Sequence, residues 1–357
     1  MQPLDDNFEY SRKRYGRGFQ YYDVVELQKV NCKNKLKSIK AIAIPPMWND
    51  VLISLKVDSK IVAVGRDAKG RKQYIYSEKW QLQQQKTKFN KLVEFAHALG
   101  PIRRTCRALL EEPKWPLDKV VALMVLILDE SGIRIGNKRY SKENESYGLS
   151  TLRRRHLLEP GDNSDAGDNS EDSNSKAVNG EAVSFDFIGK SGKHRKVHID
   201  EPELVQHIKD SAQLPGYNLF RYQENVDNKH AWSDVCSDDV NEFIKENMGD
   251  AFSSKDFRTW TGTCLAVEYY WETLAENNQN NQNKRKKIVN IVVEKVAKTL
   301  GNTPTICREY YIHPIILAKI ENKTLDTTPQ NAENEGDATE LSALECFVLD
   351  LIQQNAF

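Results

Sequence analysis

The spacing of apolar residues changes near Trp80, and this change constrains the fold of the 357-residue chain more than any other feature. Before it, short apolar segments stop at turn-forming residues, as Ile61–Val64 does before Gly65–Gly70. Beyond it, apolar residues recur at intervals of three and four, the period of a helix. The pattern predicts an α+β chain, with a small β-rich domain at residues 1–92 and a larger, mainly α-helical domain at residues 93–357.

The same pattern predicts individual elements within each domain. In the β-rich domain, Ile42–Ile44, Val51–Val57 and Gln73–Tyr76 are expected to be extended and to include a hairpin. In the larger domain, Val183–Ile188 and Arg195–Ile199 flank a Lys-Ser-Gly-Lys turn, which predicts a second β-hairpin. The remaining segments are expected to be helical and include Val120–Leu128, Ser237–Asn247, Asp256–Glu276, Lys287–Leu300 and Leu341–Ile352.

Two polar segments interrupt the larger domain. Residues 159–181 and 323–340 are acidic and poor in apolar side chains, which predicts a disordered insert and a flexible tail segment. The formal net charge is zero, but acidic residues gather in these segments. Basic residues therefore predominate elsewhere, as at Arg12–Arg17, Lys33–Lys40 and Arg66–Lys72. The overall charge does not exclude a nucleic-acid partner.

Several classes of protein are excluded or disfavoured by composition. No apolar run approaches the roughly 20 residues of a membrane span, and residues 1–10 lack the pattern of a secretory signal. The six cysteines are scattered without CxxC or paired Cys/His spacing, which argues against structural zinc and a disulfide framework. We therefore expect a cytoplasmic, nucleoid-associated protein without a membrane partner.

A pair of tyrosines near the end of the chain is the first candidate for chemistry. The helix predicted at Lys287–Leu300 is closed by Gly301, and Asn302-Thr303-Pro304 is expected to cap and open the next helix. That helix carries Tyr310 and Tyr311. Adjacent residues on a helix point in different directions, so at most one of the two tyrosines faces a given site.

The string Leu-Gly-Asn-Thr-Pro-Thr-Ile-Cys-Arg-Glu-Tyr-Tyr-Ile-His-Pro, residues 300–314, resembles the nucleophile segment of type IB DNA topoisomerases. The resemblance is to the compact bacterial and poxvirus-like branch, whose catalytic domain is related to that of tyrosine recombinases. Further segments match in the order that the family requires, and together they span nearly the whole chain. These segments are Gly65–Tyr74, Ile133–Tyr140, Lys142–Leu152, Phe187–Lys193 and Lys255–Trp260.

The resemblance implies a mainly helical catalytic domain and a site of two arginines, a lysine, a histidine or asparagine, and a tyrosine. Matched by motif, the catalytic residues are Arg134, Lys190, Arg258, Asn302 and Tyr311. Asn302 stands where some members of the family have histidine. The family implies a 3′-phosphotyrosine intermediate, and we expect neither a cofactor nor a metal nor ATP to be needed, because the sequence has no ligand cluster and no P-loop.

Phosphoryl transfer from a diester requires these residue types on chemical grounds. Negative charge gathers on the non-bridging oxygens, which two arginines can meet with forked, protonated donors. Asn302 offers an amide N–H, and Lys190 is the candidate acid that protonates the leaving 5′-oxygen. We expect Lys190 to lie close to the arginines and to be partly desolvated.

Each of these residues also has a purely structural interpretation when it is considered alone. The interpretations are an ion pair of Arg134 with Asp129 or Glu130, stacking of Arg258 on Trp260, a solvated turn position for Lys190, and a helix N-cap for Asn302. The catalytic hypothesis is preferred because the structural ones would all have to hold at once.

Candidate DNA contacts lie mainly in the β-rich domain, where basic residues alternate with Gln and Tyr. Basic side chains suit phosphates, while Gln and Tyr can reach base edges. We expect DNA contacts at Arg66, Lys69, Arg71, Lys72, Gln73, Tyr74, Tyr76 and Tyr140. The segment from Arg12 to Arg17 is expected to be an arm that orders on DNA. The two domains are expected to act as a monomeric clamp around duplex DNA.

Two alternative functions stay open at the level of sequence. Tyrosine site-specific recombinases share the catalytic residues, but they usually carry histidine where this chain has Lys255, and their N-terminal domain is helical. A DNA-binding protein that has lost catalytic activity is the other alternative. Relaxation of a plasmid of arbitrary sequence would separate the topoisomerase from both.

Overall fold

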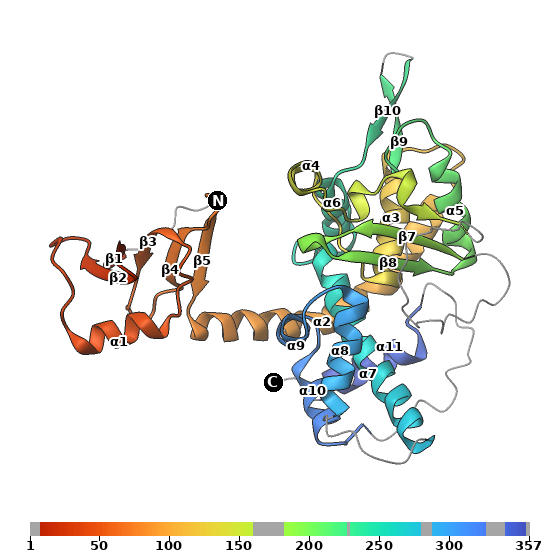
Figure 1. Cartoon of the computed structure of the whole chain (residues 1–357). Coiled ribbons are helices and arrows are strands. Elements are labelled where there is room, and N and C mark those ends of the chain that lie inside the picture. Colours follow the sequence, from red (N-terminus) through yellow and green to blue (C-terminus); the bar gives the residue numbers. More distant parts are fainter. Residues whose placement is uncertain (1–7, 160–181, 227–228, 280–287, 326–339, 355–357) are drawn as a thin grey trace. The chain divides into compact units, whose positions relative to one another are not determined.

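A computed structural model describes residues 8–159, 182–226, 229–279, 288–325 and 340–354 (Figure 1). The acidic insert predicted at 159–181 and the tail predicted at 323–340 fall almost entirely outside these residues. The chain divides into two compact units, Met1–Phe89 and Asn90–Phe357. The predicted domain boundary follows residue 92, within the helix α2 (Glu78–Leu110) that passes from one unit into the other.

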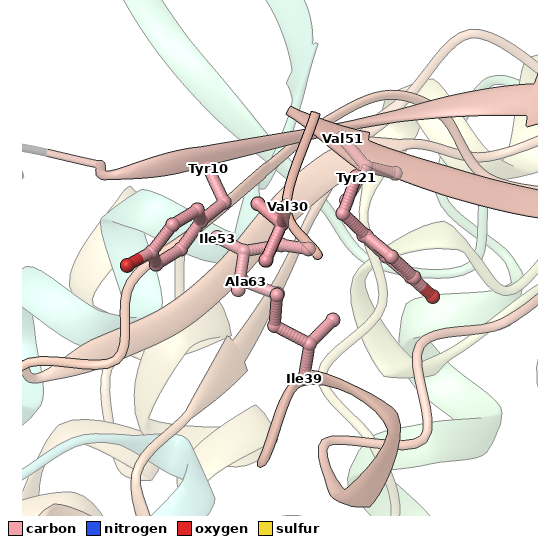
Figure 2. Packing of buried hydrophobic residues seen from close by; sticks show 7 residues of the cluster. All are labelled: Tyr10, Tyr21, Val30, Ile39, Val51, Ile53 and Ala63. Atoms are coloured by element: carbon pink, nitrogen blue, oxygen red, sulfur yellow. The ribbon is translucent and has the colours of Figure 1, made fainter. Parts of the chain in front are cut away.

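The N-terminal unit is built on a five-stranded antiparallel sheet in the order β2-β1-β3-β4-β5. Its elements are β1 (Tyr10–Tyr15), β2 (Gly18–Asp23), α1 (Lys33–Ala41), β3 (Asn49–Ile53), β4 (Ile61–Arg66) and β5 (Lys72–Tyr76). Figure 2 shows the core of this unit, in which Ile39 of α1 is buried with side chains of the sheet. The other members of the cluster are Tyr10, Tyr21, Val30, Val51, Ile53 and Ala63.

Three predictions for this unit are wrong. Ile42–Ile44 is not a strand, because it follows α1 as a turn and loop, and the strand expected at Val51–Val57 ends at Ile53. The segment from Arg12 to Arg17 is not an arm, because it belongs to β1 and its turn. The buried Arg12 guanidinium donates hydrogen bonds to the carbonyl oxygens of Ile44, Pro45 and Trp48, at 3.2, 3.0 and 2.8 Å. Arg12 therefore holds the β-sheet to the loop that precedes β3.

The second unit is mainly helical, and the apolar helix α3 (Leu117–Ser131) lies at its centre with side chains from Lys119 to Leu128 buried. α3 contacts α5 (Pro202–Ala212), α6 (Ser237–Met248) and α7 (Ser254–Gln279). α7 in turn contacts α8 (Ile288–Leu300), α10 (Pro314–Glu321) and α11 (Ala343–Gln353). The shorter helices are α4 (Lys138–Asn144) and α9 (Pro304–Tyr310). Among the described residues, no helix is both long and apolar enough to cross a membrane.

Two small antiparallel sheets complete this unit. The predicted hairpin is confirmed as β7 (Val183–Ile188) and β8 (His194–Ile199), with β6 (Leu157–Leu158) paired to β7. The expectation that the rest of the chain is helical is wrong at a second hairpin, which consists of β9 (Arg221–Val226) and β10 (Lys229–Asp234). The described parts therefore form an α+β fold, as predicted.

A buried ionic network connects four helices of the unit. Arg103 of α2 contacts Asp129 of α3 at 2.6 Å and Glu345 of α11 at 2.7 Å. Glu345 also accepts a hydrogen bond of 2.9 Å from the indole N–H of Trp260, on α7. A buried cation requires such partners, because an unpaired charge away from water is strongly unfavourable. The network fixes α11 against the helix that carries Arg258.

Candidate active site

Four of the five candidate catalytic residues, Arg134, Arg258, Asn302 and Tyr311, meet at the C-terminal end of α8. Helical carbonyl groups at this end lack partners within the helix and carry a partial negative charge. Gly301 ends the helix with a φ of +63°, a conformation that favours glycine. Arginine side chains from three distant segments donate to four consecutive carbonyl oxygens. The pairs are Arg195 with Lys298 (2.7 Å) and Thr299, Arg258 with Leu300 (2.8 Å), and Arg134 with Gly301 (3.1 Å).

Arg134 lies in the loop after α3, and a hydrogen bond to its main-chain carbonyl oxygen holds it in place. The carbonyl oxygen of Arg134 accepts a hydrogen bond of 2.8 Å from the N–H of Leu149. A side chain at Gly148 could not be accommodated, because its Cβ would lie 2.6 Å from the same carbonyl oxygen. Burial lowers the pKa of the Arg134 guanidinium, and the neighbouring Tyr311 opposes this effect. The ion pair considered for Arg134 is not formed by Asp129, whose carboxylate binds Arg103.

Asn302 is oriented by Arg134. The Nη2 group of Arg134 donates a hydrogen bond to Oδ1 of Asn302, which identifies the other side-chain atom as the amide nitrogen. That Nδ2 is buried and has no nitrogen or oxygen acceptor among the described residues, although the thiol of Cys307 lies beside it. The N-cap prediction for Asn302 is wrong, because Thr303 caps α9 by accepting from the N–H of Ile306 at 3.4 Å. Asn302 thus keeps one donor available.

Arg258 lies on α7 and is only 4% exposed. Its Nη1 group donates to the carbonyl oxygen of Gly132, and its guanidinium carbon lies 5.1 Å from the centre of the Tyr311 ring. Burial and the nearby charge of Arg134 lower the pKa of Arg258 to about 10, while Tyr311 opposes the change. Arg258 therefore stays protonated at neutral pH. Its Nε is buried and has no hydrogen-bond acceptor among the described residues.

Tyr311 follows the last residue of α9, and its N–H donates to the carbonyl oxygen of Cys307 at 2.9 Å. Its backbone packs directly against α7 at Gly262, where an added Cβ would lie 2.7 Å from the carbonyl oxygen of Tyr311. Thr263 accepts a hydrogen bond of 3.2 Å from the N–H of His313, which holds the same segment. Gly262 was not singled out in the sequence, although a glycine inside a long helix is itself a signal of close packing.

Lys190 is not brought to the other four residues by any contact that the structure records. It lies exposed in the turn between β7 and β8, where Ser191 and Gly192 have positive φ angles of 65° and 71°. The expectation that Lys190 is partly desolvated is therefore wrong for this structure. Arg195, on the same hairpin, does reach α8, and sequence reasoning missed it.

The candidate DNA contacts on β4 and β5 are organised by Asp67, a residue that is not among the predicted contacts. Its carboxylate accepts from the backbone N–H of Lys69 and Arg71 at 2.9 Å each, from Nε of Arg71 at 2.8 Å, and from Nε2 of Gln73 at 3.0 Å. These bonds, above all the one from Arg71, lower the pKa of Asp67 to about 2. The turn is therefore held in one conformation.

The remaining candidates in the N-terminal unit lie on the same hairpin. Arg66 donates to the carbonyl oxygen of Gly70 at 3.0 Å, and Lys72 lies 5.4 Å from the centre of the Tyr74 ring. Tyr74 stacks against Tyr76 with ring centres 6.2 Å apart. Basic and aromatic side chains are thus grouped at one hairpin. The backbone of Tyr140 lies in α4, but its side chain is outside the described part of the structure.

Comparison with known proteins assigns the chain to a family. A family model described as the catalytic core of eukaryotic DNA topoisomerase I matches residues 77–337, more than half of the chain. The chain belongs to the type IB DNA topoisomerases. A second model, the N-terminal domain of bacterial DNA topoisomerase IB, matches residues 18–67 and places the protein in the bacterial and poxvirus-like branch.

Individual relatives of this topoisomerase agree with the assignment. DNA topoisomerase 1B of Acanthamoeba polyphaga mimivirus is 28% identical over 317 residues, which cover 87% of each chain. DNA topoisomerase 1B of vaccinia virus (strain Copenhagen) is 24% identical over 292 residues, 81% of this chain and 80% of its own. The protein is therefore an ATP-independent type IB topoisomerase, and the recombinase alternative loses its support.

Proposed function

We propose that this topoisomerase relaxes supercoiled duplex DNA by attack of the Tyr311 hydroxyl on one backbone phosphate. The attack forms a 3′-phosphotyrosine and releases a 5′-hydroxyl, the DNA strand rotates, and the reverse reaction reseals it. The proposal is supported by one observation above all. Arg258 lies over the Tyr311 ring and shares the end of α8 with Arg134 and Asn302. The phosphotyrosine retains the energy of the original diester, so resealing requires no ATP.

The positive charge of the site has a specific task in this reaction. As the bond to the leaving oxygen lengthens, charge spreads over the non-bridging oxygens of the phosphate. Nε of Arg258 and Nδ2 of Asn302 are suited to meet that charge, because both are buried donors without an acceptor among the described residues. Removal of one such donor typically lowers the rate about 100- to 1000-fold. The Tyr311 hydroxyl gives up its proton to solvent as its oxygen bonds to phosphorus.

The leaving 5′-oxygen needs a proton, and we assign its donation to Lys190. Alkoxides are poor leaving groups, so a positioned acid contributes typically 100- to 10,000-fold. Lys190 lies in a short turn of the β7–β8 hairpin, with its ammonium group exposed. The proposed reaction therefore requires this turn to approach the bound phosphate.

DNA binding is assigned to the hairpin of β4 and β5 in the N-terminal unit together with the catalytic unit. The exposed side chains of Arg66, Lys69, Arg71 and Lys72 suit phosphates, and Gln73, Tyr74 and Tyr76 suit base edges. We propose that a single copy binds one duplex through both units. Sedimentation of the protein with a short duplex would report one protein per DNA; a dimer on DNA would contradict this part of the proposal.

Replacement of the nucleophile tests the proposal directly. Tyr311→Phe is expected to abolish relaxation and the covalent protein–DNA adduct while DNA binding survives. Tyr310→Phe is the matched control and is expected to relax plasmid at the wild-type rate, because one tyrosine faces the site. Both would be assayed on supercoiled plasmid in EDTA without nucleotide. Relaxation by Tyr311→Phe would refute the assignment, and an inactive wild-type protein would favour a DNA-binding role without catalysis.

A further inference from the structure

We propose that Arg195 is the positioning residue for the general acid, because it holds the hairpin that carries Lys190 against the end of α8. This inference rests on the proposed role of Lys190. Arg195 is on β8, and its guanidinium donates to the carbonyl oxygens of Lys298, at 2.7 Å, and Thr299.

Two glycines show how closely Arg195 is fitted between the hairpin and α8. A Cβ added at Gly189, which precedes Lys190, would lie 2.9 Å from Cγ of Arg195. A Cβ added at Gly301, which precedes Asn302, would lie 2.6 Å from Cζ of Arg195. The side chain therefore extends from the backbone beside the proposed acid to the backbone beside the proposed amide donor. A change in its position would move one segment relative to the other.

The charge of Arg195 makes this placement specific. Burial and the positive charge of Arg134 both lower the pKa of Arg195, and Arg195 in turn acts on Arg258. A third cation beside two others is unfavourable unless negative groups offset it. The C-terminal carbonyls of α8 supply that offset, since cations are favoured at the negative end of a helix. A hairpin that only packed over α8 would not require a buried cation placed against the helix carbonyl groups.

The hydrogen bonds of Arg195 distinguish positioning from direct catalysis. Both of its Nη groups donate to carbonyl oxygens of α8. Arg258 and Asn302, by contrast, each keep a buried donor without an acceptor among the described residues. Arg195 is therefore suited to set the distance between Lys190 and the phosphate rather than to bind the phosphate itself.

A substrate with sulfur in place of the leaving 5′-oxygen tests the proposal, because a thiolate departs without a proton. Single-turnover cleavage by Arg195→Ala is expected to be about 10- to 100-fold slower on the oxygen substrate, the cost of a misplaced catalytic group. On the sulfur substrate, the cleavage rate of Arg195→Ala is expected to approach that of the wild type. Arg195→Met, which keeps the aliphatic stem between the glycines, is expected to behave in the same way. The ratio of sulfur to oxygen rates is independent of the folded fraction of each preparation.

Two further variants complete the design. Lys196→Ala removes a positive charge from the exposed side of the same strand and is expected to leave both rates unchanged. Lys190→Ala tests the proposed acid itself and is expected to be rescued by sulfur. Rescue of Lys190→Ala without rescue of Arg195→Ala would overturn the positioning role alone, as would a normal oxygen rate in Arg195→Ala. Failure of sulfur to rescue Lys190→Ala would overturn the acid assignment instead.

Discussion

The contact between Gly262 and the Tyr311 backbone allows a quantitative prediction. In Gly262→Ala the new Cβ would lie 2.7 Å from the Tyr311 carbonyl oxygen and 3.0 Å from Cδ1 of Leu300. Ordinary contacts begin near 3.4 Å, so the Tyr311 peptide must retreat by roughly 0.7 Å. A displacement of about 1 Å at a reacting group can cost about 100-fold in rate. We therefore expect single-turnover cleavage to fall between about 10- and 100-fold.

The same substitution should affect stability much less than activity. Overpacking costs about 1–3 kcal/mol, but alanine favours a helix over glycine by about 1 kcal/mol. The free energy of unfolding is therefore expected to fall by no more than about 2 kcal/mol, and DNA binding should be retained. Gly18→Ala is the matched control, because a Cβ at that position meets nothing within 4 Å.

Three measurements on the purified variants decide the outcome: single-turnover cleavage of a short duplex, DNA affinity by gel shift, and urea denaturation. A Gly262→Ala protein that is folded, binds DNA and cleaves within about twofold of wild type would refute the reasoning, since the Tyr311 backbone would then tolerate displacement. An equal loss of activity in Gly18→Ala would also refute it.

Two further predictions concern other parts of the molecule. Asp67→Ala should broaden the pattern of cleavage sites mapped on a plasmid, because Arg71 and Gln73 lose the acceptor that they share. Total DNA affinity should not weaken, because the substitution also removes a negative charge. An unchanged pattern of cleavage sites would contradict this prediction. His313 is buried, its Nδ1 accepts from the N–H of Ile315, and burial lowers its pKa to about 4. The contribution of neutral His313 to the free energy of unfolding is therefore complete above pH 6.5. It is lost as pH falls toward 4, by up to about 1.4 kcal/mol per pH unit. His313→Asn keeps a capping side chain but removes the titrating ring. Between pH 7 and 5, the free energy of unfolding from urea denaturation should therefore vary less steeply with pH in this variant than in the wild type. An equally steep dependence would exclude His313 as the source of the pH dependence.

Elements with a strong local pattern could be predicted from the sequence. The β7–β8 hairpin has apolar residues on both sides of a Gly-containing turn, and α3 is apolar along nearly its whole length. The β9–β10 hairpin could not be predicted, because its strands are polar and their pairing is supported by the 2.9 Å contact of Arg221 with Asp234. Helix α1 was missed for a similar reason, since Ile39 is its one buried residue.

The site was predictable as a set of residues but not as an arrangement. Arg134, Arg258, Asn302 and Tyr311 were chosen by resemblance, and their roles stay predictions. The local pattern suggested that Asn302 caps a helix, but its Oδ1 is bound by Arg134, which lies 168 residues earlier in the chain. Contacts of this kind depend on tertiary packing and leave no periodic signal.

The network of Arg103, Asp129, Glu345 and Trp260 has a practical consequence for the design of shortened proteins. The match to the topoisomerase family model ends at residue 337, before α11 begins at Ala343. A protein trimmed to that limit would lose Glu345, which shares a buried guanidinium with Asp129 and accepts from the indole of Trp260, two residues after Arg258 on α7. Helix α11 thus belongs to the smallest unit suitable for expression, and a fusion partner is better joined beyond Gln353.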